Sequence, residues 1–418
     1  MSLVCGLDFG TSNSTIARLD TNGVPQLLKL EDGRQTIPSV IFFGFEDDTI
    51  HFGRKAVAEY VTGADGRLMR SLKSVLGTAL IGDSTRVKAR SYGFLDILGI
   101  FIGELKRRAE SELDGQVDSV VCGRPVHFVD EDPVADRAAQ DQLESAVRGQ
   151  GFRHVDFQFE PIAAALDYER QVTAERLALI VDLGGGTSDF SVVRVSPERA
   201  KSMDRGGDIL ATAGVHVGGT DFDRLLSMTR VMPELGLGTK TRDGKRHLPV
   251  APYYDLSTWH RINRLYNAQT LRDLRGTSRE AQAPERVDMM IELIEDRLGH
   301  RLVGAVETAK IALSDADTTN FVFPVRDQQI ETELTIEHLT AALHSSVSRI
   351  EDTIAETLKR AGIGAGDIDS LILTGGSTQV PAIAGRLRAL FPDADLVRTD
   401  VLGSVGLGLA MDAKRKFG

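Results

Sequence analysis

Apolar residues along this chain form two kinds of pattern: short continuous runs, and stretches with the three- and four-residue spacing of a helix. The continuous runs predict buried strands at Leu3–Phe9, Leu177–Val181 and Ser370–Thr374. Because strands and helices alternate in both halves of the chain, the predicted fold class is α/β. The helical spacing predicts helices at Glu104–Glu112, Ala135–Arg148, Pro161–Glu169, Asp288–Leu313 and Ile336–Lys359.

One strand–turn–strand pattern occurs twice. Asp8 is followed by an apolar residue, a glycine and a hydroxyl residue, and a strand resumes over Ser14–Asp20. Asp182 begins the same order of residue types, and a strand follows over Phe190–Val195. We interpret the pair as an internal duplication that gives two related lobes, each contributing a hairpin turn to a shared cleft. Chance recurrence of a glycine-rich turn is the alternative.

A third glycine turn, Gly375–Thr378, follows a predicted strand and precedes a helical pattern that starts near Pro381. Proline is favoured in the first turn of a helix. Backbone N–H groups and the helix dipole at such a place point toward a bound anion. The turn is therefore a candidate binding site for a phosphate or a nucleotide.

Composition and charge exclude several classes of protein and of binding partner. Of the 418 residues 42% are hydrophobic and 26% charged, which excludes wholesale disorder. A net charge of −11 disfavours general binding of nucleic acid or anionic membranes. Two cysteines exclude a disulfide framework and a cysteine-rich metal site. The N-terminus has no basic region of the kind that begins a signal peptide, and no apolar run is long enough to span a membrane. These two features predict a soluble, cytoplasmic protein.

The paired turns carry a specific chemistry. Backbone N–H groups in tight turns bind anions, and glycine lets the backbone approach a phosphate without a Cβ clash. Asp8 and Asp182 would repel phosphate unless a Mg²⁺ ion and its waters lie between. The turns therefore predict a magnesium–nucleotide site, without a Walker A loop or a Rossmann spacing at Gly184–Gly186. The alternative is that both aspartates only cap their own turns.

The segment 239–286 differs from the rest of the chain in charge. It holds ten Lys or Arg against five Asp or Glu, and it contains the only tryptophan, Trp259. Arginine, tyrosine and tryptophan dominate protein interfaces. The segment is predicted either as an insertion that binds a protein partner or as a locally packed excursion with a solvated basic face.

The motifs together resemble the DnaK-type heat-shock chaperone family, which belongs to the actin, sugar-kinase and heat-shock ATPase superfold. Two segments, Cys122–Val126 and Gly151–Glu160, are more similar to the YegD-like branch of that family. Six segments follow the order of the family's motifs along the chain: Leu7–Ser14, Glu160–Leu166, Asp182–Asp189, Gly218–Asp223, Glu307–Ser314 and Leu373–Thr378.

The resemblance implies a two-lobed, actin-like ATPase fold with duplicated β-sheet subdomains around a nucleotide cleft. The expected organisation is lobe I over 1–171 with an inserted subdomain at about 39–112, lobe II over 172–398 with an enlarged inserted subdomain at about 225–335, and a C-terminal helix over 399–418 that returns to the cleft.

The resemblance also implies roles for single residues. Asp8 and Asp182 hold the waters of a Mg²⁺ ion, and Glu160 touches the hydrated metal or the attacking water. Lys73 orients that water and, with Thr187, belongs to the catalytic set. Residues expected to contact ATP or ADP are Gly10, Thr11, Ser12, Asn13, Gly184, Gly185, Gly186, Gly218, Gly219, Glu307, Lys310, Ser314, Gly375, Gly376, Ser377, Gln379 and Asp400.

Each assignment has a simpler alternative. Lys73 is a solvated surface lysine if the resemblance does not extend to it. The alternative for Glu160 is that it only stabilises a helix N-terminus, as acidic residues do. Lys310 and Ser314 share one helix face and are solvated if they do not bind a nucleoside. Pro125 matches the family's interdomain switch proline, or it is an ordinary strand-end proline.

Three departures from the family pattern limit the inference. Ile311 and Gln379 stand where the family usually places arginines that grip the adenine, so weaker or less selective base binding is expected. The chain ends where a linker and a peptide-binding β-sandwich would follow, which puts a peptide-clamping cycle in doubt.

The sequence therefore predicts a weak Mg-ATPase whose hydrolysis accompanies lobe closure, with a chaperone-like or partner-regulating role. The expected protein partner binds the 239–286 insertion, and neither nucleic acid nor a membrane is expected as a partner. The alternatives are a non-hydrolysing nucleotide sensor or actin-like scaffold, and a small-molecule kinase of the same superfold.

Overall fold

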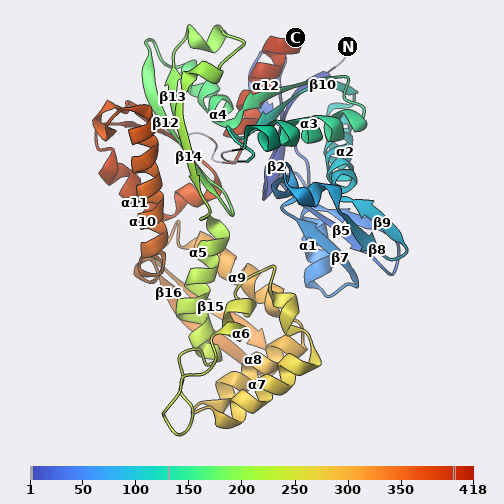
Figure 1. Cartoon of the computed structure of the whole chain (residues 1–418), viewed down its shortest axis with the longest axis vertical. Helices are drawn as coiled ribbons and strands as arrows, with labels where there is room; N and C mark the ends of the chain where they lie inside the picture. The colour runs from blue at the N-terminus through green and yellow to red at the C-terminus, as the bar shows by residue number, and fades with distance from the viewer. Residues whose placement is uncertain (1–2, 130–131, 399, 401) are drawn as a thin grey trace. The chain divides into compact units, whose positions relative to one another are not determined.

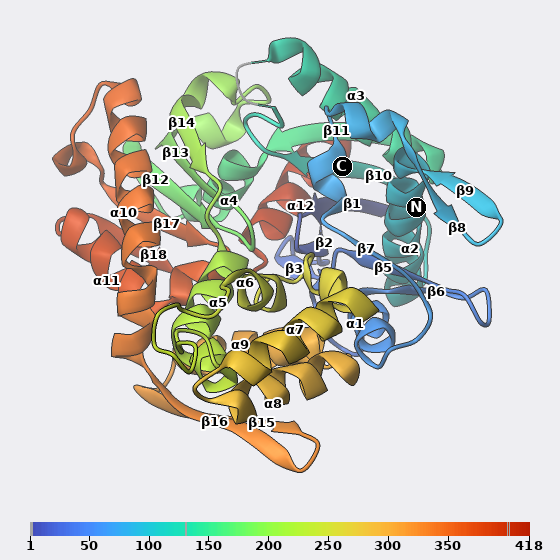
Figure 2. The same cartoon turned by 60° about the horizontal axis from the view of Figure 1, so that its bottom comes forward.

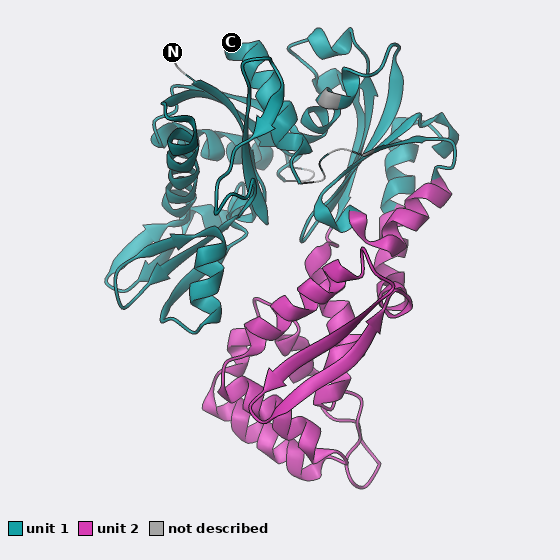
Figure 3. Cartoon of the chain, turned by 180° about the vertical axis from the view of Figure 1, so that it is seen from behind, with its two compact units in different colours: residues 1–215, 353–378, 391–418 teal, residues 216–352, 379–390 magenta. Residues whose placement is uncertain are grey.

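A computed structural model describes residues 3–129, 132–398, 400 and 402–418. The chain divides into two compact units, drawn in two colours in Figure 3. Unit 1 holds residues 1–215, 353–378 and 391–418, and unit 2 holds residues 216–352 and 379–390. The first two residues of the chain and the expected boundary at 399 lie outside the described residues.

Unit 1 contains two sheets of the same topology. The first has the order β11–β10–β1–β2–β3, with β4 paired to β2, and the second has the order β14–β13–β12–β17–β18. In each, an antiparallel hairpin, β1–β2 or β12–β13, continues into parallel strands. The predicted duplication is thus confirmed. The bounds are β1 Leu3–Phe9, β2 Asn13–Leu19, β3 Pro25–Leu27, β4 Ile37–Pro38, β10 Val117–Arg124, β11 His154–Phe159, β12 Arg176–Leu183, β13 Ser188–Val195, β14 Ile209–Val215, β17 Ser370–Thr374 and β18 Asp395–Arg398.

Helices cover these sheets (Figure 1). Apolar residues of α2 and α3 pack with β1 and β10 in the largest core. Helix α12 packs on β1, β2 and α4, and Gly408 makes its close approach to α4 possible, because a Cβ there would lie 1.9 Å from the Ala163 carbonyl oxygen. The bounds are α1 Gly53–Val61, α2 Phe94–Leu113, α3 Pro133–Gly149, α4 Glu160–Glu169 and α12 Ser404–Phe417, with small sheets formed by β5 Val40–Gly44, β6 Ile50–Phe52, β7 Gly66–Arg70, β8 Ser84–Val87 and β9 Arg90–Gly93.

Unit 2 is mainly helical, with one hairpin, β15–β16, packed beside α9 (Figure 2). Helix α10 belongs to unit 2 up to Asp352 and to unit 1 from Thr353. The bounds are α5 Gly219–Leu226, α6 Ala251–Leu256, α7 Ala268–Glu280, α8 Pro284–Glu295, α9 Gly299–Ala312, β15 Thr318–Val325, β16 Gln328–Thr335, α10 Ile336–Ala361 and α11 Pro381–Leu390.

One predicted helix is wrong. The stretch Asp288–Leu313 was expected to be continuous, but it breaks between α8 and α9. Arg297 adopts a left-handed conformation with φ 53°, which no α-helix accommodates. The apolar spacing resumes after the break, so it predicts both helices and hides the turn between them. None of the described helices is long and apolar enough to cross a membrane.

Candidate functional site

The first predicted phosphate turn joins β1 to β2. Gly10 is required there, because a Cβ would lie 2.2 Å from the Asn13 carbonyl oxygen. Ser39 supports the turn from outside: its hydroxyl donates to the Gly10 carbonyl at 2.7 Å, and its N–H donates to the Ser12 carbonyl at 2.9 Å. Thr11 and Ser12 are half-buried and Asn13 is exposed. The local structure therefore holds these donors in a fixed turn.

The second turn joins β12 to β13 and meets the first. The Gly184 N–H donates to the Thr187 carbonyl at 2.9 Å and closes the turn. A Cβ on Gly185 would lie 2.3 Å from the Ser12 hydroxyl, so the two turns touch. Gly186 and Thr187 are exposed. The duplicated motifs therefore come together within unit 1.

The third turn packs against the second. Gly375 has φ 80°, and a Cβ there would lie 2.3 Å from the Leu183 carbonyl oxygen and 2.9 Å from a carboxylate oxygen of Asp182. The Ser377 hydroxyl donates to the Gly184 carbonyl at 3.1 Å. Gly376 is exposed beside them. All three predicted glycine turns thus form one neighbourhood.

Four predicted catalytic residues gather beside these turns. Lys73, in a short 3-10 helix, donates to Glu160, the first residue of α4, at 2.5 Å. The two side chains are only 10% and 16% exposed, so Lys73 is not a solvated surface lysine. The charges of Asp8 and Asp182, near the ends of β1 and β12, also act on the Lys73 ammonium and raise its pKa.

The charges in this cluster shift one another. Burial raises the pKa of Asp8 to about 7, with a further contribution from Glu160. Burial and then the neighbouring Asp189 raise the pKa of Asp182 to about 8. Burial alone would lower the pKa of Lys73, but the carboxylates around it, Glu160 foremost, raise it. The cluster therefore holds more buried carboxyl groups than ammonium groups.

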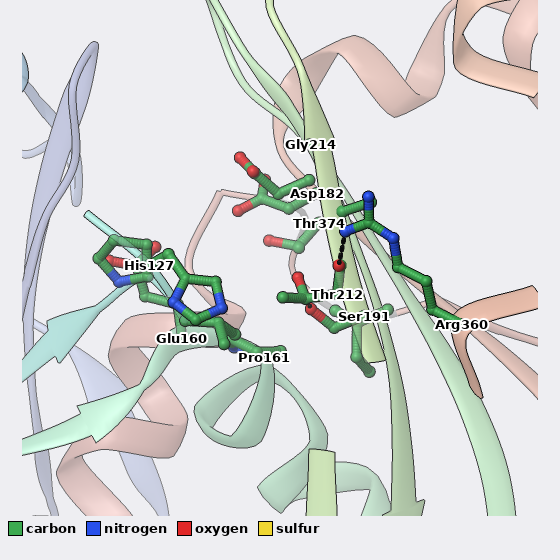
Figure 4. A pocket seen from close by; sticks show the side chains of 14 residues that line it. His127, Glu160, Pro161, Asp182, Ser191, Thr212, Gly214, Arg360 and Thr374 are labelled. Atoms are coloured by element: carbon green, nitrogen blue, oxygen red, sulfur yellow. Dashed lines mark hydrogen bonds between the residues drawn. The ribbon is translucent and has the colours of Figure 1, made fainter. Parts of the chain in front are cut away.

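A cavity of about 290 Å³ opens beside Glu160 and Asp182, within unit 1. Figure 4 shows Glu160 next to His127 on one side of the space, Asp182 near Thr374, and Arg360, which donates to the Thr212 carbonyl at 3.3 Å, on the other side. Asp189 also lines it and was not among the predicted site residues. The sequence could have indicated Asp189, because in the predicted second hairpin it is the cross-strand partner of Asp182.

Most of the remaining predicted residues belong to unit 2. Gly218 and Gly219 begin α5, and Lys310 on α9 donates to the Gly219 carbonyl at 3.2 Å. Lys310 also pairs with Asp223 at 2.7 Å and is buried, so it is not a solvated lysine. Glu307 is exposed and Ser314 is half-buried on the same segment, while Ile311 is 57% exposed and Gln379 is also exposed.

Asp400 lies in unit 1 just before α12. Its carbonyl oxygen accepts from the N–H groups of Gly403 and Ser404 at 3.0 and 2.8 Å. Its carboxylate accepts from the Leu402 N–H at 3.1 Å. Asp400 therefore organises the start of α12, and its predicted contact with a nucleoside stays a prediction.

A comparison with family models identifies one match, described as Hsp70 protein, over residues 4–232 and 279–414. The unmatched segment between them, residues 233–278, falls almost wholly in the basic segment singled out by its composition.

Curated relatives agree with this match. The chain is 26% identical over 430 residues to the chaperone protein HscA of Citrobacter koseri and to that of Salmonella typhimurium, covering 98% of this chain and 58% of each relative. It is 27% identical over 420 residues to the chaperone protein DnaK of Thermosipho melanesiensis, covering 98% of this chain and 59% of the relative. The chain thus spans a little under three fifths of these relatives.

Proposed function

This chain belongs to the Hsp70 family, and we propose that it binds Mg-ATP and hydrolyses it slowly, with hydrolysis coupled to lobe closure and to the regulation of a protein partner. The observation that carries the proposal is the Lys73–Glu160 pair beside Asp8 and Asp182. Phosphoryl transfer depends on positioning and electrostatics more than on covalent chemistry. A buried ammonium that is held by a carboxylate supplies both.

The charge balance at this cluster fits a divalent cation. The carboxylates outnumber the single ammonium, and burial, followed by repulsion from neighbouring carboxylates, raises the pKa values of Asp8 and Asp182. Among the described residues no group of three or more His, Cys, Asp or Glu is arranged to ligate a metal directly. A magnesium ion that keeps several waters and takes few carboxylates suits such a set. Asp8 and Asp182 would hold it through water, with Glu160 beside, and when bound it offsets phosphate charge.

In this proposal different residues bind the phosphates, the attacking water and the nucleoside. The turns at Gly10–Asn13 and Gly184–Thr187 bind phosphates through backbone N–H groups and hydroxyls. Lys73 holds the attacking water and offsets charge that develops on the γ-phosphate. In unit 2, Glu307 and Lys310 on α9 and Ser314 just after its end would contact the nucleoside.

A non-hydrolysing nucleotide sensor is the second candidate function. Ile311 favours it, because this exposed apolar side chain replaces a guanidinium that would stack on an adenine face. Weak base binding leaves phosphate contacts to carry most of the affinity. Hydrolysis itself separates the sensor from the ATPase.

We further propose that the basic segment 239–286 binds a protein with an acidic surface. Lys240, Lys245 and Arg279 are exposed, and none of them has an ion-pair partner within the described part of the chain. Arg224 and Arg261 both lie over the ring of Tyr254, at 5.2 and 4.9 Å from its centroid. Such arginine–tyrosine clusters are frequent interface anchors. The net charge of −11 argues against nucleic acid as the partner.

A single-turnover experiment with excess protein over Mg-ATP tests the catalytic proposal. Bound and hydrolysed fractions are recorded in the same run. Hydrolysis by the wild type that is lost in Lys73→Ala supports the ATPase. Binding without turnover supports the sensor, and turnover by Lys73→Ala at the wild-type rate contradicts the role of Lys73.

A further inference from the structure

Arg124 lies at the end of β10, directly opposite Phe159 in the parallel pairing of β10 with β11. Its side chain is only 12% exposed. The guanidinium carbon lies 5.2 Å from the ring centroid of Phe159 and 5.2 Å from that of Phe128. Both distances are within the range of cation–π attraction.

Hydrogen bonds hold the guanidinium in this position. It donates to the side chains of Gln140 at 2.5 Å and Asp136 at 2.8 Å, both on α3. It also donates to the carbonyl oxygens of Pro125 at 3.0 Å and Val126 at 3.1 Å. One side chain therefore ties the end of β10 and the loop after it to α3.

The chain leads from this contact directly to the catalytic cluster. Phe159 ends β11, and the next residue, Glu160, begins α4 and accepts from Lys73 at 2.5 Å. Because Phe159 and Glu160 share a peptide bond, a shift of the Phe159 backbone also shifts the start of α4, which carries the carboxylate. We propose that Arg124 is a positioning residue that holds Phe159, and through it the Glu160 carboxylate, in place for Lys73. The catalytic part of this inference rests on the proposed ATPase function.

The geometry requires an arginine. A planar guanidinium stacks on aromatic rings with its faces and donates hydrogen bonds in its plane, whereas a lysine ammonium cannot do both at once. We therefore expect Arg124→Lys to restore little of what Arg124→Met loses. Asp136→Asn keeps both rings and removes the charge of one anchor, which also accepts from the Phe128 N–H at 2.6 Å, so its defect should be smaller than that of Arg124→Met.

Two measurements test the inference. The first is kcat and KM for Mg-ATP, where misplacement of the Glu160–Lys73 pair should lower kcat roughly ten- to a hundredfold in Arg124→Met and leave KM within about twofold. The second is the rate at which acetic anhydride acylates Lys73 without nucleotide, followed by peptide mass spectrometry. We expect this rate to rise several-fold, because the ammonium loses its fixed partner. Arg137→Met is the matched control, since Arg137 is exposed on α3, and it should change neither measurement.

A folded Arg124→Met protein with wild-type kcat and wild-type acylation of Lys73 would overturn the inference. If Arg124→Met does not fold, unchanged kcat and acylation in Asp136→Asn overturn it instead. If the wild type binds ATP without hydrolysing it, the ATPase proposal fails, whereas the acylation rate still decides whether Arg124 positions the pair.

Discussion

The ammonium of Lys73 lies 2.5 Å from a carboxylate oxygen of Glu160, although 87 residues separate the two along the chain. Lys73 comes from a 3-10 helix near the small sheets of unit 1, and Glu160 begins α4. Both side chains are largely withdrawn from water, where an ion pair is less screened than at the surface. This pair is the feature of the molecule that most directly indicates chemistry at the glycine turns.

Replacement of Lys73 by alanine should lower single-turnover hydrolysis of Mg-ATP by roughly 10²–10³-fold, because a donor aimed at developing charge is lost. Binding of Mg-ADP should change much less, since the phosphate turns remain. Isothermal titration and quenched-flow hydrolysis measure the two effects. Lys55→Ala is the control, because Lys55 is exposed on α1. Equal losses in both variants would contradict the role given to Lys73.

Replacement of Ile311 by arginine should strengthen binding of ATP about two- to fivefold, through the stacking of a guanidinium on the base. Inorganic triphosphate separates stacking from simple charge attraction, because it has no base. We expect its affinity to rise less than that of ATP. An equal gain for both ligands would show that the new charge, and not the base, is responsible.

Replacement of Gly408 by alanine should destabilise the protein by about 1–3 kcal/mol, because the added methyl meets the Ala163 carbonyl oxygen of α4. Gly276 in α7 is the matched control, since a Cβ there meets nothing within 4 Å. Gly276→Ala should stabilise by about 0.5–1 kcal/mol through helix propensity. Denaturant unfolding measures the free energy of unfolding of both variants. A change in the same direction in the two variants would contradict the packing argument.

The Arg205–Glu169 ion pair is fully buried, with both side chains at 0% exposure and distances of 2.6 and 2.9 Å. Arg205→Met should cost about 3–5 kcal/mol, because it leaves the Glu169 carboxylate without its partner. Arg246→Met removes an exposed pair with Glu280 and should cost at most about 1 kcal/mol. Similar unfolding free energies for the two variants would contradict the burial argument.

The two buried cysteine thiols should make the stability of the protein depend on pH. Burial raises the pKa of Cys5 and of Cys122 to about 12. Unfolded thiols ionise near pH 8.5, so above that pH the unfolded state releases protons that the folded state keeps, and stability falls as pH rises. Each thiol should contribute a loss of about 1.4 kcal/mol per pH unit.

The measurement compares unfolding free energies at pH 8 and pH 10 in the wild type and in the double variant Cys5→Ala, Cys122→Ala. The decline should be shallower in the variant, whatever its absolute stability. An unchanged slope would mean that other groups govern the alkaline loss.

Part of the fold follows from local pattern. The first strand has the predicted bounds, Leu3–Phe9, because a short apolar run that ends at a glycine turn is typical of a buried strand. The break at Arg297 could not be predicted, since apolar spacing continues on both sides and only one backbone conformation changes. The helices α6 and α7 also went unpredicted, because their polar surfaces leave only short apolar periods.

By itself the sequence determined the duplicated hairpins, the glycine turns and the order of the motifs, because strand runs and turn chemistry are local properties of the chain. Only the tertiary structure decided which charges meet. Gly185 reaches Ser12, Arg124 lies against Phe159, and the Lys73 ammonium meets the Glu160 carboxylate because packed sheets and helices bring distant segments together. Spacing along the chain carries no information about such contacts, which depend on how each element buries its apolar face.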